Sequence, residues 1–150
     1  MGAVDWKHVL AVARENAQGA GIGQRYRTVE GSAFDVELGT AYDLALITNF
    51  MHHFDGSTNK SLLHKVHAAL TPGGTVAAVE LVCPHEDRVT PPLAAEFAQT
   101  MLCSTPSGTA YTFSELRSMF GDAGFHSIEL HELPPTFFRA ITAGEMSPVT

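Results

Sequence analysis

A cluster of side chains able to bind ligands and move protons stands near the middle of the 150-residue sequence. It reads Phe50-Met51-His52-His53-Phe54-Asp55 and directly follows a short apolar run, residues 42–48. The next apolar run carries a carboxylate, Glu80, near its end. An imidazole takes up and releases a proton near neutral pH. Because ligands of open α/β sheets bind outside the carboxyl ends of the strands, we expect the chemistry of this chain at these two places.

The two apolar runs fit a unit of strand, loop, helix, turn and strand. Residues 42–48 suit a strand that is buried on both faces. Five apolar residues at helical spacing predict a helix before the Thr71-Pro72-Gly73-Gly74 turn: Leu62, Leu63, Val66, Ala69 and Leu70. Residues 75–82 are predicted as the second buried strand. The sequence therefore places residues 49–55 in the loop that leaves the first strand.

The rest of the chain alternates between strands and helices in the same way. We predict strands at residues 2–5, 26–29, 125–130 and 136–142, and helices at residues 6–18, 90–104 and from about Thr112 to Ala123. Asp5 is expected to cap the first of these helices, and Thr112 or Ser114 the last. The pattern predicts an α/β fold with a mostly parallel sheet, helices on both faces and an antiparallel C-terminal strand pair. Residues 1–143 are expected to form one domain, followed by a tail at 144–150.

Composition limits the kinds of partner. The formal charge is −7 and no run is rich in lysine or arginine, which argues against nucleic acid. No apolar stretch approaches the ~20 residues that span a bilayer, and no signal peptide is visible, so we expect no membrane partner and a cytoplasmic protein. Cys83 and Cys103 lack metal-ligand spacing. His64 and His67 lie three residues apart on the predicted helix, but no third zinc ligand is near, and no metal site is expected.

Taken in order, these motifs resemble those of the class I S-adenosylmethionine (SAM) methyltransferases. The resemblance is strongest to the C-terminal catalytic domain of the small-molecule O-methyltransferases of plant phenolic and bacterial polyketide or pigment pathways. It rests on the histidine-containing loop and on four later motifs: Leu70-Thr71-Pro72-Gly73-Gly74, Val79-Glu80-Leu81-Val82, Thr112-Phe113-Ser114-Glu115-Leu116 and Ala123-Gly124-Phe125. It runs from Val4 over nearly the whole chain and implies a partial Rossmann-like SAM-methyltransferase fold.

The resemblance also implies what this chain lacks. The family's catalytic domain begins with a strand, a glycine-rich loop and a helix, which should precede Asp5, and an N-terminal domain comes before them. The one glycine-rich run, residues 19–23, follows a predicted helix and not a strand, so it reads as a helix end. We therefore expect a partial methyltransferase domain. Its unpaired strands would be closed by rearranged strand pairing or by a second copy of the chain, giving a homodimer.

Catalytic roles follow from the resemblance, position by position. His52 matches the histidine that takes the proton of a phenol in the plant members, and Glu80 matches a glutamate that orients it. The family's second orienting glutamate falls at Ala110, so that carboxylate is missing. His53 is an alternative base. The pocket for the methyl acceptor cannot be assigned from sequence, although Tyr111 is one candidate for its wall, as are Met101, Leu102 and Phe137.

The same resemblance assigns residues to the cofactor. Asp5 would bind the ribose diol, beside Trp6, and Ser32 replaces an aspartate that faces the adenine. The full set of cofactor residues is Asp5, Trp6, Ser32, Ala33, Phe34, Asn49, Phe50 and Phe54. Structural roles stay open for several of them: Asp5 could serve only as a helix cap, and the three phenylalanines could lie in the core.

Two functions from different classes follow. The first is a SAM-dependent O-methyltransferase, or a fragment of one, that moves a methyl group to a hydroxyl of an aromatic or polyketide-like small molecule. The second is a non-catalytic, truncated methyltransferase-like domain that binds no cofactor and self-associates. A nucleotide-dependent oxidoreductase is disfavoured, because the chain has no G-x-G-x-x-G fingerprint and such an enzyme gives the histidine loop no role.

Overall fold

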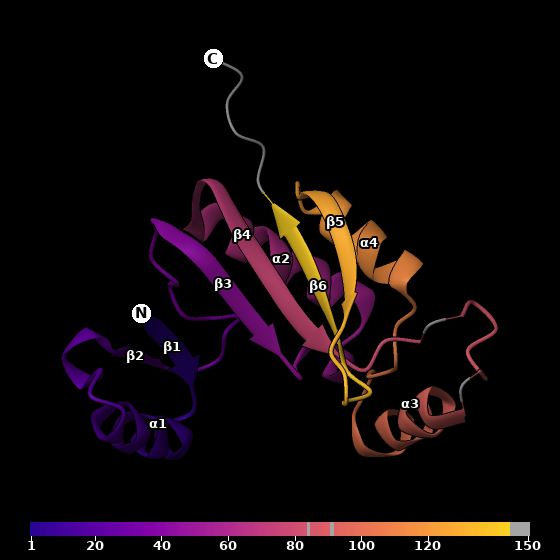
Figure 1. The fold of residues 1–150 in the computed structure, drawn as a ribbon, viewed down its shortest axis with the longest axis horizontal. Helices are drawn as coiled ribbons and strands as arrows, with labels where there is room; N and C mark the ends of the chain where they lie inside the picture. The colour runs from indigo at the N-terminus through magenta and orange to yellow at the C-terminus, as the bar shows by residue number, and fades with distance from the viewer. Residues whose placement is uncertain (84, 91, 145–150) are drawn as a thin grey trace. The chain divides into compact units, whose positions relative to one another are not determined.

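The computed structural model describes residues 1–83, 85–90 and 92–144. The chain divides into two compact units, Met1–Gly39 and Thr40–Thr150. The first unit contains β1 (Gly2–Asp5), α1 (Lys7–Gly19), the short helix η1 (Gly23–Arg25) and β2 (Arg27–Glu30) (Figure 1). β1 and β2 pair in parallel, from Gly2 opposite Arg27 to Asp5 opposite Glu30. β1, α1 and β2 each lie within one residue of their predicted positions, whereas η1 was not predicted.

The start of α1 differs from the expectation. Trp6 is the N-cap residue and makes no side-chain cap, so the prediction that Asp5 caps the helix is wrong. Asp5 is still part of β1, and its Oδ1 accepts the N–H of Trp6 at 2.7 Å. The carboxylate thus binds the peptide that leaves the strand, one residue too early to reach the first turn of the helix.

The second unit is built on a four-stranded sheet in the order β3-β4-β6-β5. These strands are β3 (Tyr42–Thr48), β4 (Leu70–Glu80), β5 (His126–Glu132) and β6 (Arg139–Gly144). β3 and β4 are parallel, whereas β4–β6 and β5–β6 are antiparallel. The α/β class and the antiparallel C-terminal pair are therefore confirmed. Gly144, the first residue of the expected tail, belongs to β6, and the rest of that tail, residues 145–150, lies outside the described residues.

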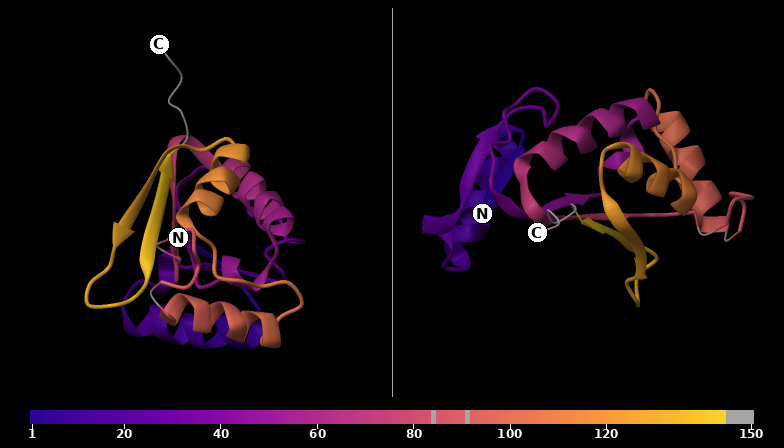
Figure 2. Two further views of the ribbon diagram at one scale, coloured as in Figure 1. Left: turned by 90° about the vertical axis from the view of Figure 1, so that its right-hand side faces the viewer. Right: turned by 90° about the horizontal axis from the view of Figure 1, so that it is seen from above.

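Three helices and one short helix complete this unit: η2 (Met51–His53), α2 (Gly56–Ala69), α3 (Pro92–Ser104) and α4 (Phe113–Asp122). Two views at right angles show α2 and α4 on the same face of the sheet (Figure 2). Leu63 of α2 and Leu116 and Phe120 of α4 are fully buried between these layers, which is the burial that holds the helices on the sheet. Within this unit the helical cover predicted for both faces is thus found on one face of the sheet.

Capping residues set where the helices begin. Thr112 accepts the N–H of Glu115, and Glu115 in turn accepts the N–H of Thr112, so the predicted cap of α4 is a full capping box. Asp55 caps α2 by accepting the N–H of Thr58 at 2.8 Å. Its hydrogen bonds with Ser57 and with the Thr58 backbone lower the pKa of the Asp55 carboxyl. Asp55 therefore ends the histidine loop and starts α2.

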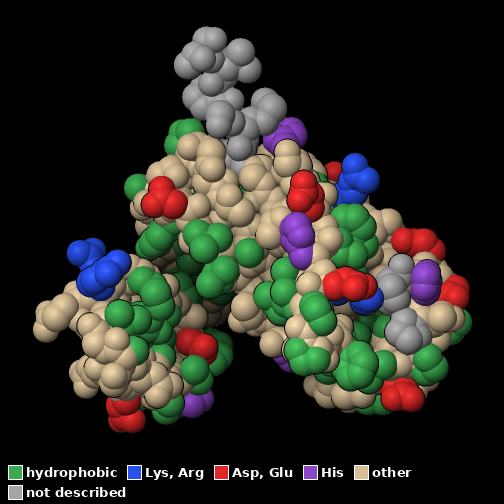
Figure 3. All heavy atoms as spheres, in the orientation of Figure 1, with side chains coloured by type: hydrophobic (Ala, Val, Ile, Leu, Met, Phe, Trp, Pro, Cys, Tyr) green, Lys and Arg blue, Asp and Glu red, His purple; other side chains and the backbone are tan. Residues whose placement is uncertain are grey.

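β3 is much more exposed than its apolar sequence predicts. Leu44 and Leu46 are 53% and 67% exposed, and Ile47 is the buried residue of the strand. β3 is an edge strand among the described residues, and its side chains alternate between the helix-covered face and the open face. The prediction of burial on both faces is therefore wrong for this unit. Figure 3 shows hydrophobic side chains gathered on the sheet face that the viewer sees. No described helix is long and apolar enough to span a bilayer.

Candidate active site

Glu80 is the centre of the hydrogen bonding around the histidine loop, which comprises residues 50–55. Its side chain is 3% exposed at the end of β4. Oε1 accepts the backbone N–H groups of Phe50 and Met51, each at 2.8 Å. Oε2 lies 2.5 Å from Nδ1 of His52. β3 delivers the loop to this carboxylate, because Thr48 is in register with Val79 and the N–H of Asn49 bonds to Val79 O.

These contacts determine the tautomer of His52. Oε1 of Glu80 accepts two peptide N–H groups, and an ionised carboxylate can only accept hydrogen bonds. The proton between Glu80 and His52 therefore belongs to Nδ1, and in the neutral imidazole Nε2 carries the lone pair. His52 is 7% exposed, and the edge of its ring meets Phe97 at a centroid distance of 4.9 Å. The arrangement presents His52 as a proton acceptor whose orientation is fixed.

His53, the alternative base, lies in a different environment. It is exposed, and its ring lies 4.3 Å from that of His52. Burial, followed by the charge of His52, lowers the pKa of His53, and the charge of Glu80 opposes that shift. No hydrogen bond orients its ring among the contacts that the structure describes, so His52 is the better-held imidazole of the two.

Two residues outside the predicted site hold the loop from its other side. Asn59 of α2 is fully buried, and its Nδ2 donates to Met51 O at 2.8 Å and to Phe54 O at 3.2 Å. The hydroxyl of Tyr111 donates to Phe54 O at 2.5 Å. Burial raises the pKa of Tyr111, which keeps this hydroxyl protonated. The sequence carried a signal for Asn59, since it lies three and four positions before Leu62 and Leu63, on the buried stripe of α2.

The segment before α4 packs against the backbone of His52. The N–H of Thr109 donates to His52 O at 2.9 Å. A Cβ on Gly108 would lie less than 3.0 Å from that same oxygen and from Oγ1 of Thr105. Only glycine therefore allows this backbone to approach the loop so closely.

Ala110, where the second family glutamate would stand, is sealed in the core. It is 0% exposed and belongs to a cluster with Cys83 and Ala94. Its carbonyl accepts the guanidinium of Arg88 at 3.2 Å and the thiol of Cys83 at 3.6 Å. Burial also raises the pKa of Cys83, so this thiol stays protonated. The position offers no carboxylate, as the sequence predicts.

The candidate cofactor residues of the first unit lie together at the carboxyl ends of β1 and β2. Asp5 is opposite Glu30 in the parallel register, and the N–H of Gly31 bonds to Asp5 O. Gly31 has φ 139°, and a Cβ there would lie 2.7 Å from Val36. This turn leads directly into Ser32, Ala33 and Phe34. Within its unit, the structure thus brings Asp5 and Trp6 to the same sheet end as the residues 32–34.

The remaining candidates, Asn49, Phe50 and Phe54, belong to the second unit with His52 and Glu80. The rings of Phe50 and Phe54 pack 5.0 Å apart with a tilt of 45°. Asn49 is exposed and has φ 51°, a left-handed conformation that asparagine tolerates. The candidate residues therefore form two groups, one at the strand ends of each unit.

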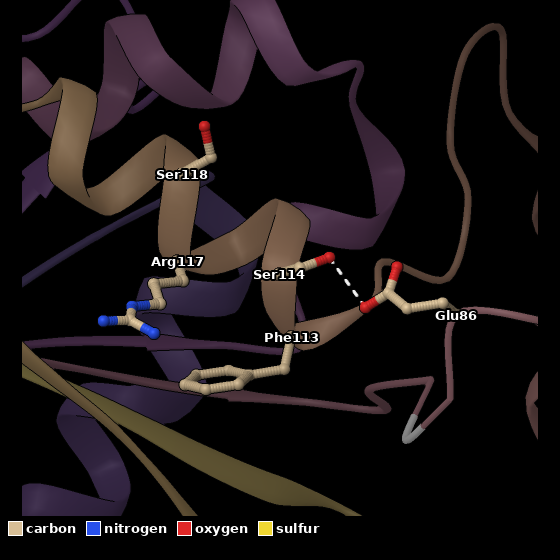
Figure 4. Close-up of a pocket in the computed structure, with 5 residues that line it drawn as sticks. All are labelled: Glu86, Phe113, Ser114, Arg117 and Ser118. Atoms are coloured by element: carbon tan, nitrogen blue, oxygen red, sulfur yellow. Dashed lines mark hydrogen bonds between the residues drawn. The ribbon is translucent and has the colours of Figure 1, made fainter.

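Two hollows of the second unit are lined by none of the catalytic or cofactor candidates. One hollow, of about 520 Å³, is lined by Glu86, Phe113, Ser114, Arg117 and Ser118. Figure 4 shows Ser114 bonded to Glu86, with the other side chains spread along α4. A second cavity of about 140 Å³ lies between α3 and the β5–β6 connection. No group of three possible metal ligands occurs among the described residues, and His67 packs on Phe125.

The four residues predicted as possible walls of the methyl-acceptor pocket differ in their exposure to solvent. Met101 and Tyr111 are 7% and 8% exposed and are part of the core. Leu102 and Phe137 are 76% and 73% exposed. The structure leaves the acceptor pocket unassigned among the described residues.

The sequence of the chain matches a known protein family. A family model of the O-methyltransferase domain matches residues 2–126. The chain belongs to this family. Over 141 residues it is 31% identical to 3-hydroxy-5-methyl-1-naphthoate 3-O-methyltransferase of Streptomyces sahachiroi, covering 94% of this chain and 40% of that enzyme.

Solved structures of related proteins share the fold of this chain. A Nostoc punctiforme protein, provisionally described as an O-methyltransferase, is 49% identical with a TM-score of 0.91, over 96% of this chain and 44% of its own. Human N-acetylserotonin methyltransferase in complex with SAM has a TM-score of 0.81 at 23% identity, over 97% of this chain and 40% of its own, which shows a shared fold. The chain thus spans less than half the length of these O-methyltransferase relatives.

Proposed function

We propose that this chain is the C-terminal part of the catalytic domain of a SAM-dependent O-methyltransferase that methylates a hydroxyl of an aromatic or polyketide-like small molecule. The observation that carries the proposal is the contact between Nδ1 of His52 and Glu80 at 2.5 Å. This contact holds a histidine with its Nε2 free to accept a proton, in a member of the O-methyltransferase family. The acceptor class is supported by the naphthoate O-methyltransferase relative.

The residues of the first unit suit SAM. Oδ1 of Asp5 accepts the Trp6 N–H, and no described hydrogen bond uses Oδ2, which can accept a ribose hydroxyl. Oγ of Ser32 accepts the N–H of Phe34 at 3.2 Å, so its own proton can be donated to an adenine nitrogen. Trp6 is 56% exposed and offers an open ring face. The remaining candidates for contact with the cofactor are Ala33 in the first unit and Asn49, Phe50 and Phe54 in the second.

The chemistry divides between the cofactor and the chain. When bound, SAM supplies an electrophilic methyl group on a sulfonium. His52 would receive the proton of the acceptor hydroxyl at Nε2 while Nδ1–H remains bonded to Glu80. The Glu80 carboxylate then stabilises the resulting imidazolium, because it lies 3% exposed in direct contact with the ring. The chain therefore contributes a base and its orientation, which together give about 10²–10⁴ in rate.

Binding is the first test. The chain is titrated with S-adenosylhomocysteine by calorimetry, with Asp5→Ala as the variant and Asp35→Ala, in the same unit, as the matched control. Micromolar binding that is lost in Asp5→Ala and kept in Asp35→Ala supports the cofactor role. Absence of heat at millimolar ligand, with a folded chain by circular dichroism, would refute it for this chain.

Methyl transfer is the second test. The chain is incubated with SAM labelled in its methyl group and a panel of hydroxylated aromatic acids that includes a hydroxynaphthoate. His52→Gln keeps a polar side chain but removes the base and should lower transfer by about 10²–10⁴. Equal activity in His53→Gln and the unsubstituted chain would separate the two histidines. Undiminished transfer by His52→Gln would mean that proximity alone drives the reaction.

A specific observation supports a second candidate, the non-catalytic domain that self-associates. β3 has a free edge among the described strands, with Leu44 and Leu46 exposed beside it. We propose that two copies form a homodimer through this edge. Antiparallel pairing about Ala45 would set Leu44 of one copy against Leu46 of the other. Light scattering should give a dimer for the unsubstituted chain and a monomer for Leu46→Lys. A monomer at all concentrations would refute the homodimer.

We further propose that the protein acts in the cytoplasm. Support comes from Cys83 and Cys103, which are both free thiols and therefore suit a reducing compartment. Fractionation of cells that express a tagged chain is the test. Recovery in a secreted or membrane fraction would contradict the proposal.

A further inference from the structure

Asn59 is polar, although its buried position in α2 would suit an apolar residue. It shares the buried stripe of α2 with Leu62, Leu63 and Val66 and is itself 0% exposed. Its Oδ1 is buried and has no hydrogen-bond partner among the described residues. A buried amide oxygen without a partner destabilises the folded state. The compensating contacts of Asn59 are those of its Nδ2, and both go to the histidine loop.

Tyr111 makes the same kind of contact from another element. Its hydroxyl, on the segment that precedes α4, donates to Phe54 O at 2.5 Å. Asn59 Nδ2 donates to that same oxygen at 3.2 Å and to Met51 O at 2.8 Å. The two carbonyls that bracket His52 and His53 are thus both bound by side chains from outside the loop.

The opposite side of the loop is bound by Glu80, through the N–H groups of Phe50 and Met51. The peptide groups of Met51 are therefore held at both ends: the N–H by a carboxylate and the C=O by an amide. His52 follows immediately, so the direction of its Cα–Cβ bond depends on this clamp.

We propose that Asn59 and Tyr111 are positioning residues that fix the direction of the His52 imidazole by holding Met51 O and Phe54 O. Asn59 and Tyr111 hold the backbone on either side of the two histidines. A second carboxylate would instead hold the imidazole ring directly, but the position that matches it in the family is Ala110 in this chain. The role rests on the proposed function only in so far as His52 acts as the base. The orientation itself can be measured without cofactor or substrate.

The decisive variant is Tyr111→Phe, which removes one oxygen atom and keeps the ring. Tyr42→Phe is the matched control, since Tyr42 is 36% exposed on β3 of the same unit. Two signals are read by NMR on the folded chain: the ¹⁵N shifts of the His52 ring and the hydrogen exchange of the Met51 N–H. Asn59→Leu, which fits the apolar stripe and removes the amide, is the second variant.

We expect Tyr111→Phe to speed exchange of the Met51 N–H by about tenfold, the effect of losing one buried hydrogen bond. The His52 ring signals should shift or broaden. The double variant should add little to Asn59→Leu, because both residues hold Phe54 O, and should exceed Tyr111→Phe, because Asn59 also holds Met51 O. Tyr42→Phe should change neither signal. Should Asn59→Leu fail to fold, Tyr111→Phe alone decides.

A merely structural role would give a different result. The melting temperature would fall in Tyr111→Phe, while the His52 signals and the Met51 N–H exchange stayed as in Tyr42→Phe. That result would overturn the proposal. If instead the signals move as expected but His52→Gln leaves methyl transfer intact, the positioning role stands and the catalytic role of His52 fails.

Discussion

Substituting Glu80 by glutamine tests the centre of the site with almost no change in shape. The carboxylate accepts three hydrogen bonds, from the N–H groups of Phe50 and Met51 at 2.8 Å and from Nδ1 of His52 at 2.5 Å. The glutamine oxygen can keep the two peptide donors. Its NH₂ group must then face Nδ1, where two donors would meet. The proton of His52 must therefore move to Nε2 in Glu80→Gln.

The size of the effect follows from the charge. A hydrogen bond to a charged group contributes about 1.5–3 kcal/mol, and a neutral one about 0.5–1.5 kcal/mol. Three bonds that lose their charge would then cost about 3–4 kcal/mol. Removing a buried charge offsets part of this loss, so we expect Glu80→Gln to lower the free energy of unfolding by about 1–3 kcal/mol. Methyl transfer should fall by about 10²–10⁴, the contribution of a general base.

Two measurements check this prediction, and Glu129→Gln, on an exposed position of β5, is the control. Urea unfolding gives the stability difference. The ¹⁵N shifts of the His52 ring tell which nitrogen carries the proton. The reasoning is refuted if Glu80→Gln keeps the proton on Nδ1 and unfolds at the same urea concentration as Glu129→Gln.

Three further predictions concern the surroundings of the loop. Gly108→Ala should destabilise the fold by about 1–3 kcal/mol, since its Cβ would collide with His52 O; a urea midpoint equal to that of the parent would contradict the close approach. Thr112→Ala should cost about 1–2 kcal/mol through loss of the α4 cap, whereas Thr112→Ser should cost much less; thermal melts of the two variants compare them. His53→Gln should reduce the loss of stability between pH 7 and pH 5. The pKa of His53 is lowered in the folded state, so as the pH is lowered the unfolded chain takes up this proton first and the stability of the fold decreases. Unfolding curves of His53→Gln that match those of the parent at both pH values would exclude this role.

Elements with strong local signals could be read from the sequence. The capping box at Thr112 and Glu115 is a local pattern, and α4 begins where that pattern predicts. The apolar run at residues 42–48 gave β3 its bounds, because strand propensity and length depend on the run itself. Its burial could not be read in the same way. Whether Leu46 is covered depends on which elements pack over the open face, and that information is not local.

The site was predictable where it rests on motifs and unpredictable where it rests on single contacts. The strand ends predicted the place of the chemistry, and the family resemblance predicted that Glu80 orients His52; the structure brings the two side chains into contact. Asn59 was missed because a polar residue in a helix reads as solvent-facing until its phase is compared with that of Leu62. The cap of α1 was mispredicted because a shift of one residue turns a helix cap into a strand end, and the sequence pattern does not resolve such a shift.

The sealed position of Ala110 constrains how this site can evolve. Its neighbours Cys83 and Ala94 are 1% and 2% exposed, and its carbonyl is bound by Arg88. A glutamate introduced there would bury a charge against small side chains and displace them. Such a change becomes acceptable only after other substitutions have made room, so the effect of one mutation depends on the presence of another. A chain that carries alanine at this position is therefore separated from the two-carboxylate form of the site by an epistatic barrier.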